Sequence, residues 1–104
     1  MLIYKIFPNQ DKLLLESTQQ KKILNFCRNR NILAVKVDST STRGWPDLTC
    51  VLPNGVVLFV ELKTATGVVS ALQKRMISKI NSNKGNVYVV RSEKEFIELI
   101  ESKI

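Results

Sequence analysis

The sequence predicts an α/β domain in which helices flank a mixed β-sheet. Short apolar runs rich in β-branched residues predict strands, and longer stretches with apolar residues at helical spacing predict helices. Their order along the chain is helix, three strands, helix, strand, helix. A helix between the last two strands is the connection that a parallel pair needs, whereas a short turn joins antiparallel strands. The length of 104 residues predicts one domain, 1–104.

The first elements lie before residue 38. A short strand is expected over Leu2–Phe7 and a helix from about Glu16 to Arg30. The run Ile32–Val37 predicts the first strand of the central group, and a polar loop follows it. The apolar stripe of the helix consists of Ile23, Leu24 and Cys27.

Two apolar runs in the middle of the chain contain charged residues, Asp47 in the first run and Glu61 and Lys63 in the second. If Asn54-Gly55 formed a two-residue turn, Asp47 would lie opposite Leu62. A three-residue loop, Pro53 to Gly55, places it opposite Glu61 instead. The longer loop has better turn chemistry, because proline presets the first position and glycine suits the left-handed one. The sequence therefore predicts that Asp47, Glu61 and Lys63 converge on one face of a hairpin.

Two carboxylates on directly opposed strand positions lie close together and repel unless a positive charge lies between them. Carboxylate oxygens are ligands that Mg²⁺ prefers, so a divalent cation is one interpretation. A salt-bridged Asp–Lys–Glu cluster or a solvated face of the sheet is the other.

The remaining elements follow the hairpin. Ser70 is the predicted N-cap of a helix, Asn86–Val90 the last strand, and Ser92 with Glu95 a capping box that opens the final helix. The apolar faces of the two helices consist of Leu72, Met76 and Ile80 and of Phe96, Ile97 and Ile100.

Net charge and amino-acid composition limit the classes of function that the chain can have. Sixteen Lys and Arg against nine Asp and Glu give a net charge of +7, which favours a polyanionic partner such as nucleic acid. The chain has no histidine, which excludes histidine-based catalysis and histidine metal sites. Cys27 and Cys50 lack a metal-ligand spacing and are interpreted as small buried residues in a reducing compartment. The apolar start lacks the length of a signal peptide or membrane span, so a cytoplasmic protein is expected.

Pro46-Asp47 followed by Glu61-Leu62-Lys63 resembles the motif of the PD-(D/E)xK nuclease superfamily. The segments "RGWPDL", "ELKTATG", "SALQKR" and "VYVVRS" together resemble the VRR-NUC (virus-type replication-repair nuclease) family, over roughly Glu16 to Ser92. The resemblance implies a restriction-endonuclease-like core and a Mg²⁺- or Mn²⁺-dependent DNA endonuclease.

The resemblance also implies roles for individual residues. Asp47, Glu61 and the backbone carbonyl of Leu62 match the metal ligands, and Lys63 matches the catalytic lysine. Gln73 matches the glutamine that closes the family motif, although its spacing from Ser70 also fits a capping box. Glu16 matches an acidic residue of the first helix that lies near the metal in many members, although an acid at a helix N-terminus is also favourable on its own.

Basic residues outside the motif are expected to bind DNA phosphates or to be solvated on helix faces. They are Arg43, Lys74, Arg75, Lys79, Lys21, Lys22 and Lys84. Trp45 is expected to pack on the core or to stack on a base.

Small stand-alone members of the family are similar to phage junction-resolving enzymes. This analogy implies a homodimer that recognises branched DNA such as four-way junctions (Holliday junctions) by shape, in the host cytoplasm if the chain is phage-encoded. The alternative is a DNA-binding module without catalytic activity. The sequence leaves open whether one or two metals bind and whether Lys63 acts as a base or as a fixed cation.

Overall fold

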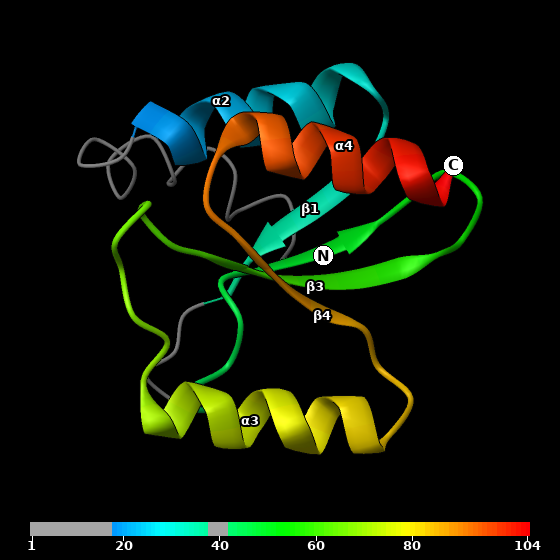
Figure 1. Ribbon diagram of the computed structural model, residues 1–104. Helices are drawn as coiled ribbons and strands as arrows, with labels where there is room; N and C mark the ends of the chain where they lie inside the picture. Colours follow the sequence, from blue (N-terminus) through cyan, green and yellow to red (C-terminus); the bar gives the residue numbers. More distant parts are fainter. Residues whose placement is uncertain (1–17, 38–41) are drawn as a thin grey trace.

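The computed structural model describes residues 18–37 and 42–104, and these form a four-stranded mixed sheet with helices on both faces (Figure 1). The strand order is β1-β2-β3-β4, with two antiparallel pairs and a parallel β3–β4 pair. This confirms the predicted α/β class. The elements are α2 (Thr18–Asn29), β1 (Leu33–Lys36), β2 (Leu48–Val51), β3 (Val57–Leu62), α3 (Ala71–Ser82), β4 (Val87–Val90) and α4 (Glu93–Lys103). The strand expected over Leu2–Phe7 lies outside the described residues.

The β2–β3 hairpin has the three-residue loop that its turn residues predict. Leu48 pairs with Val60, and the Leu52 N–H donates to the Val56 carbonyl at 2.8 Å. Gly55 adopts φ +87°, a left-handed conformation that costs glycine little. Pro53, Asn54 and Gly55 therefore form the loop, and the register is the one that brings Asp47 and Glu61 together.

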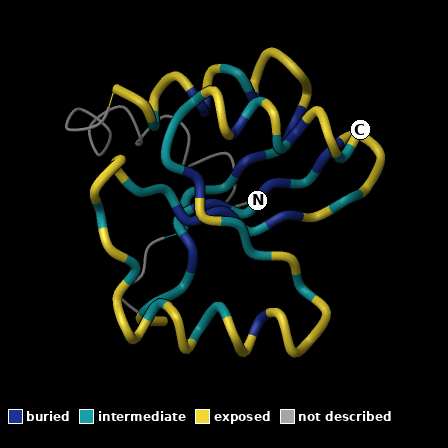
Figure 2. The backbone as a smooth tube through the Cα atoms, in the orientation of Figure 1, coloured by how far each residue is buried: buried dark blue, intermediate teal, exposed yellow. Residues whose placement is uncertain are grey.

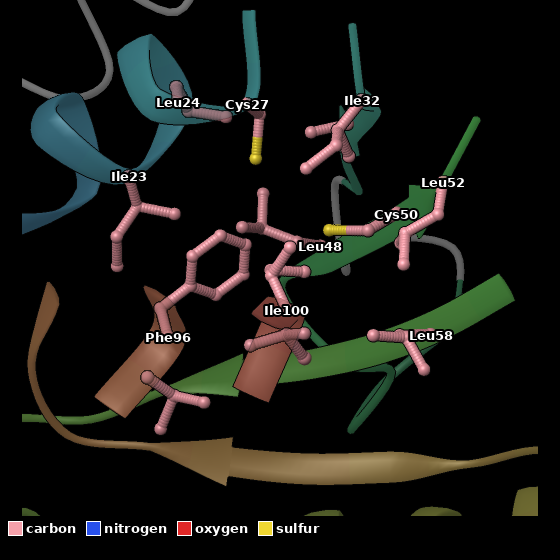
Figure 3. Packing of buried hydrophobic residues seen from close by; sticks show 13 residues of the cluster. Ile23, Leu24, Cys27, Ile32, Leu48, Cys50, Leu52, Leu58, Phe96 and Ile100 are labelled. Carbon is pink, nitrogen blue, oxygen red and sulfur yellow. The ribbon is translucent and has the colours of Figure 1, made fainter. Parts of the chain in front are cut away.

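Helices α2 and α4 cover one face of the sheet, and the main core lies beneath them (Figures 1 and 3). The even-numbered residues of β2 and β3 point into this core, as the period of a strand requires. Cys27 and Cys50 are free thiols that are both fully buried, which confirms them as small core residues. The core consists of Ile23, Leu24, Cys27, Ile32, Ala34, Leu48, Cys50, Leu52, Leu58, Val60, Val90, Phe96 and Ile100.

Among the described residues, α3 is the one helix on the opposite face, and its apolar layer is thin (Figures 1 and 2). Ile80 is the one buried residue of this helix, whereas Met76 is half-buried and Leu72 is 37% exposed. The expected apolar face of α3 is therefore only partly buried, because one helix cannot cover the width of four strands.

The predicted N-caps Ser70 and Ser92 are both confirmed, but the two capping boxes differ. Ser70 and Gln73 exchange both hydrogen bonds of the box. Ser92 accepts from the Glu95 N–H, whereas Glu95 Oε1 accepts from the N–H of Arg91 and not from that of Ser92. The expected box in α4 is thus half formed, because the Glu95 side chain satisfies a donor one residue further back. Ile97, expected in the core, is half-buried.

Candidate functional site

The site begins at the open end of the β2–β3 hairpin, on the face that α3 covers. Continuing the observed register by one residue from Leu48 and Val60 places Asp47 opposite Glu61. Glu61 is 2% exposed and is the buried charged residue among those described. A carboxylate in that position loses nearly all of its hydration, so its surroundings determine whether it is ionised.

Asp47 is held by the neighbouring strand. Its Oδ2 accepts a hydrogen bond from the backbone N–H of Leu62 at 2.8 Å. Continuing the register one residue further places Pro46 beside Leu62. Proline has no N–H, so Pro46 cannot donate to the Leu62 carbonyl as another residue in a ladder would. The Leu62 carbonyl therefore receives no hydrogen bond from residue 46. The Leu62 N–H donates to the Asp47 carboxylate instead of to a backbone carbonyl of β2.

Gln73 connects α3 to Glu61. Its Nε2 donates to Glu61 Oε2 at 2.9 Å, while its Oε1 accepts from the Ser70 N–H at 2.9 Å. The Gln73 backbone N–H donates to Ser70 Oγ at 3.1 Å, which completes the box. Because the Ser70 N–H can only donate, it fixes which end of the amide faces Glu61. The Gln73 side chain therefore completes the predicted capping box and also contacts Glu61.

Lys63 follows the last residue of β3 and lies beside Glu61. Its Nζ is 3.4 Å from Glu61 Oε2, and its side chain is 19% exposed. The Lys63 N–H donates to the Val90 carbonyl at 3.0 Å, which extends the β3–β4 pairing by one residue. Glu61 Oε2 therefore faces one cation and one amide donor.

The environment of Glu61 raises its pKa to about 7. Burial is the largest cause, and the charge and hydrogen bond of the adjacent Asp47 carboxyl raise it further. The Lys63 ammonium acts in the opposite direction but does not cancel these effects. At neutral pH the two carboxyl groups therefore share a site that does not readily hold two negative charges.

Two cavities adjoin this group. The first, the Asp47 cavity, has a volume of about 210 Å³, and its walls include Arg43, Trp45, Asp47, Leu72 and Gln73. The second, the Lys63 cavity, has a volume of about 430 Å³ and lies between the start of α2, the loop after β3 and the start of α4. Glu61 contacts Asp47 and Gln73, which line the Asp47 cavity, and Lys63, which lines the Lys63 cavity.

The other predicted site residues are spread over the surface. Arg43 is exposed at the Asp47 cavity, and Lys74, Arg75 and Lys79 are exposed on α3. Lys21 and Lys22 are exposed on α2, which covers the opposite face of the sheet (Figure 1). Glu16 lies outside the described residues, but Gln19 and Gln20 in the first turn of α2 line the Lys63 cavity.

Arg91 is a structural partner of the site that sequence reasoning missed. Its Nη1 donates to the carbonyls of Thr64 and Gly67 at 2.8 and 2.7 Å, which ties down the loop directly after Lys63. These hydrogen bonds join residues more than twenty positions apart, so no local sequence pattern predicts them.

The donors present fit a hard divalent cation. Asp47 and Glu61 supply carboxylate oxygens at one point, and the Leu62 carbonyl lies at the same strand end. A cation there would relieve the repulsion that raises the Glu61 pKa. Within residues 18–37 and 42–104, no cluster of three or more His, Cys, Asp or Glu side chains is placed to hold a metal.

None of the helices in the described part of the chain is both long and apolar enough to cross a membrane.

Comparison with known proteins identifies the family to which this chain is similar. No curated protein matches the chain. A solved structure described as a VRR_NUC domain has a TM-score of 0.72 and 31% identity, and the match covers 82% of this chain and 92% of that one. The model of the VRR-NUC domain family matches residues 36–94, which include Asp47, Glu61, Lys63 and Gln73. This family consists of nuclease domains, which implies DNA as the partner. The chain belongs to the VRR-NUC family.

Proposed function

We propose that the chain is a Mg²⁺- or Mn²⁺-dependent DNA endonuclease whose active site comprises Asp47, Glu61, Lys63 and Gln73. The observation that carries the proposal is the buried Glu61 carboxyl group, which lies against Asp47 across the hairpin and 3.4 Å from the Lys63 ammonium. Perturbed titratable groups of this kind concentrate at functional sites.

In this proposal Asp47, Glu61 and the Leu62 carbonyl would hold the metal ion, and Glu16, which precedes α2 in the sequence, is a further candidate ligand. When bound, the ion supplies a Lewis acid that polarises a phosphate oxygen and lowers the pKa of a water molecule. The Leu62 N–H fixes the Asp47 carboxylate, and the Gln73 amide fixes Glu61. These contacts hold the two acids in place before the substrate arrives, which is how preorganised sites gain rate.

In this proposal Lys63 acts on the attacking water or on the developing charge at phosphorus. The distance of 3.4 Å between its Nζ and Glu61 Oε2 supports this role. Arg43 at the Asp47 cavity and the exposed Lys74, Arg75 and Lys79 of α3 would bind phosphates on either side of the cut. Lys21 and Lys22 would contact a second arm of the DNA from α2.

The proposal includes a homodimer that acts on branched DNA. The net charge of +7 favours contacts with the phosphate backbone, which do not read the base sequence. Two copies would present two sites to a four-way junction. Sedimentation of the protein with and without a junction measures this stoichiometry.

Cleavage assays test the proposed activity directly. Supercoiled plasmid, linear duplex and four-way junction are incubated with wild type or Glu61→Gln in Mg²⁺, Mn²⁺ or EDTA. We expect wild type to cut in both metals but not in EDTA, and Glu61→Gln to remain folded and inactive. Cleavage in EDTA, or an unchanged rate for Glu61→Gln, would refute the proposal. Binding without cleavage under every condition would favour the DNA-binding module instead.

A further inference from the structure

Trp45, the only tryptophan of the chain, separates the Asp47 cavity from another hollow on the same face of the sheet. This hollow, the Phe59 cavity, has a volume of about 280 Å³, and its walls include Trp45, Phe59, Met76 and Ile80. It lies between α3 and the sheet, where the apolar layer is thin. The indole ring thus borders both the acidic site and an apolar cavity.

The loop before β2 holds Trp45 in this position. Gly44 adopts φ +83°, and a Cβ atom there would lie 2.8 Å from the Leu72 carbonyl oxygen. Only glycine allows this close approach of the loop to the start of α3. The Trp45 ring meets Phe59 edge to face at 5.8 Å between centroids, but Trp45 remains half-buried. Part of the indole surface therefore remains accessible to solvent.

Basic residues accompany both cavities. Arg43 lines the Asp47 cavity and Lys79 lines the Phe59 cavity, and both residues are exposed. Leu72 and Lys79 lie seven residues apart on α3, which spans about 10 Å at 1.5 Å per residue. Apart from Asp47, no acidic residue of the described chain lines either cavity. An aromatic ring between two cations is the arrangement that binds single-stranded nucleic acid, with bases on the ring and phosphates on the cations.

We propose that Trp45 is a stacking platform for an unpaired base next to the phosphate that is cut, so that the preferred substrate carries single-stranded nucleotides at the cleavage position. This inference rests on the proposed nuclease function, because it takes the scissile phosphate to lie at Asp47 and Glu61. A base in a continuous duplex is stacked on its neighbours and must be unstacked to reach the ring, which costs a few kcal/mol. A branch point or a single-stranded arm supplies such a base without that cost.

The fluorescence of the single tryptophan reports on the contact without any cleavage. Glu61→Gln, in EDTA and at low salt, is titrated with a short oligothymidylate and with an abasic oligomer of the same length. Anisotropy of end-labelled oligomers measures binding independently. Both oligomers should bind through their phosphates, but the thymidylate should quench the Trp45 emission at least twofold more strongly. Equal quenching by the two oligomers, saturable thymidylate binding without a change in emission, or no binding would overturn the inference.

A pair of lysine variants tests the predicted path of the strand. Lys79→Gln should weaken thymidylate binding several-fold, because it removes a cation from the Phe59 cavity. Lys94→Gln changes an equally exposed lysine on α4 and should leave it unchanged. Equal effects of the two variants would also overturn the inference. Failure of the nuclease proposal is separate, because it would appear as an unchanged cleavage rate in Glu61→Gln.

Discussion

Burial and the neighbouring Asp47 carboxyl disfavour the ionised form of Glu61. The Lys63 ammonium and the Gln73 amide are the groups that favour it. The ordinary Glu61 pKa of 4.5 rises to about 7 in the folded chain, so the folded state binds the proton more tightly than the unfolded state does. The resulting stabilisation is complete below about pH 4.5 and is lost as the pH rises through about 7.

In EDTA the free energy of unfolding should therefore fall with rising pH by an amount on the order of 3 kcal/mol, at about 1.4 kcal/mol per unit of pKa shift. Urea unfolding at several values between about pH 4.5 and pH 8 measures this slope. Glu61→Gln, which does not titrate, is the control and should lack this component. Parallel curves for the two proteins would show that the Glu61 pKa is not raised.

Asp47→Asn tests the repulsion between the two acids. The asparagine oxygen can still accept the Leu62 N–H, and the negative charge beside Glu61 is gone. At pH 8 in EDTA this variant should melt at or above the wild-type temperature. Mg²⁺ at a hundred times its dissociation constant should stabilise wild type by about 2.7 kcal/mol and the variant by much less.

A simple salt bridge between Asp47 and Lys63 predicts the reverse. In that case Asp47→Asn would destabilise the metal-free protein, and Mg²⁺ would change neither melting temperature. Thermal melts of both proteins in Mg²⁺ and in EDTA distinguish the two accounts.

At the scale of elements, the start of α3 determines the geometry of the site, because Ser70 and Gln73 form the cap that directs an amide to Glu61. Ser70→Ala and Ser92→Ala each remove the hydroxyl of an N-cap and should each cost about 1 kcal/mol of stability. Only Ser70→Ala should also lower the cleavage rate, because loss of the Ser70 Oγ acceptor loosens the first turn of α3 that carries Gln73, whereas α4 presents no side chain to the acidic pair. Equal cleavage rates per folded molecule in the two variants would disprove this role of the cap.

The hairpin and the start of α3 were predictable because their signals are local. Pro53, Asn54 and Gly55 specify a loop, and the loop specifies the strand register. Contacts between distant segments were not predictable. Three features depend on how the elements pack. They are the hydrogen bond from the Arg91 N–H to Glu95, the hydrogen bonds from Arg91 to the loop after Lys63, and the thin apolar layer beneath α3.

At the scale of the whole molecule, the positive charge is spread over both faces of the sheet. Lys21 and Lys22 lie on α2, and Lys74, Arg75 and Lys79 lie on α3 (Figure 1). The sequence alone shows how much charge there is, but not that the two groups face away from each other. This distribution means that loss of one lysine removes only a small part of the phosphate-binding charge.

Lys63→Ala therefore separates binding from chemistry, and it tests most directly whether the group of Asp47, Glu61 and Lys63 is a nuclease active site. The measurement is the single-turnover cleavage rate of a four-way junction in Mg²⁺, at protein concentrations where anisotropy shows the DNA to be fully bound. Lys94→Ala, with an exposed lysine removed from α4, is the control. We predict that Lys63→Ala binds the junction within a few-fold of wild type and cuts it at least about 100-fold more slowly. Cleavage by Lys63→Ala at the rate of wild type and of Lys94→Ala would contradict this account of the site.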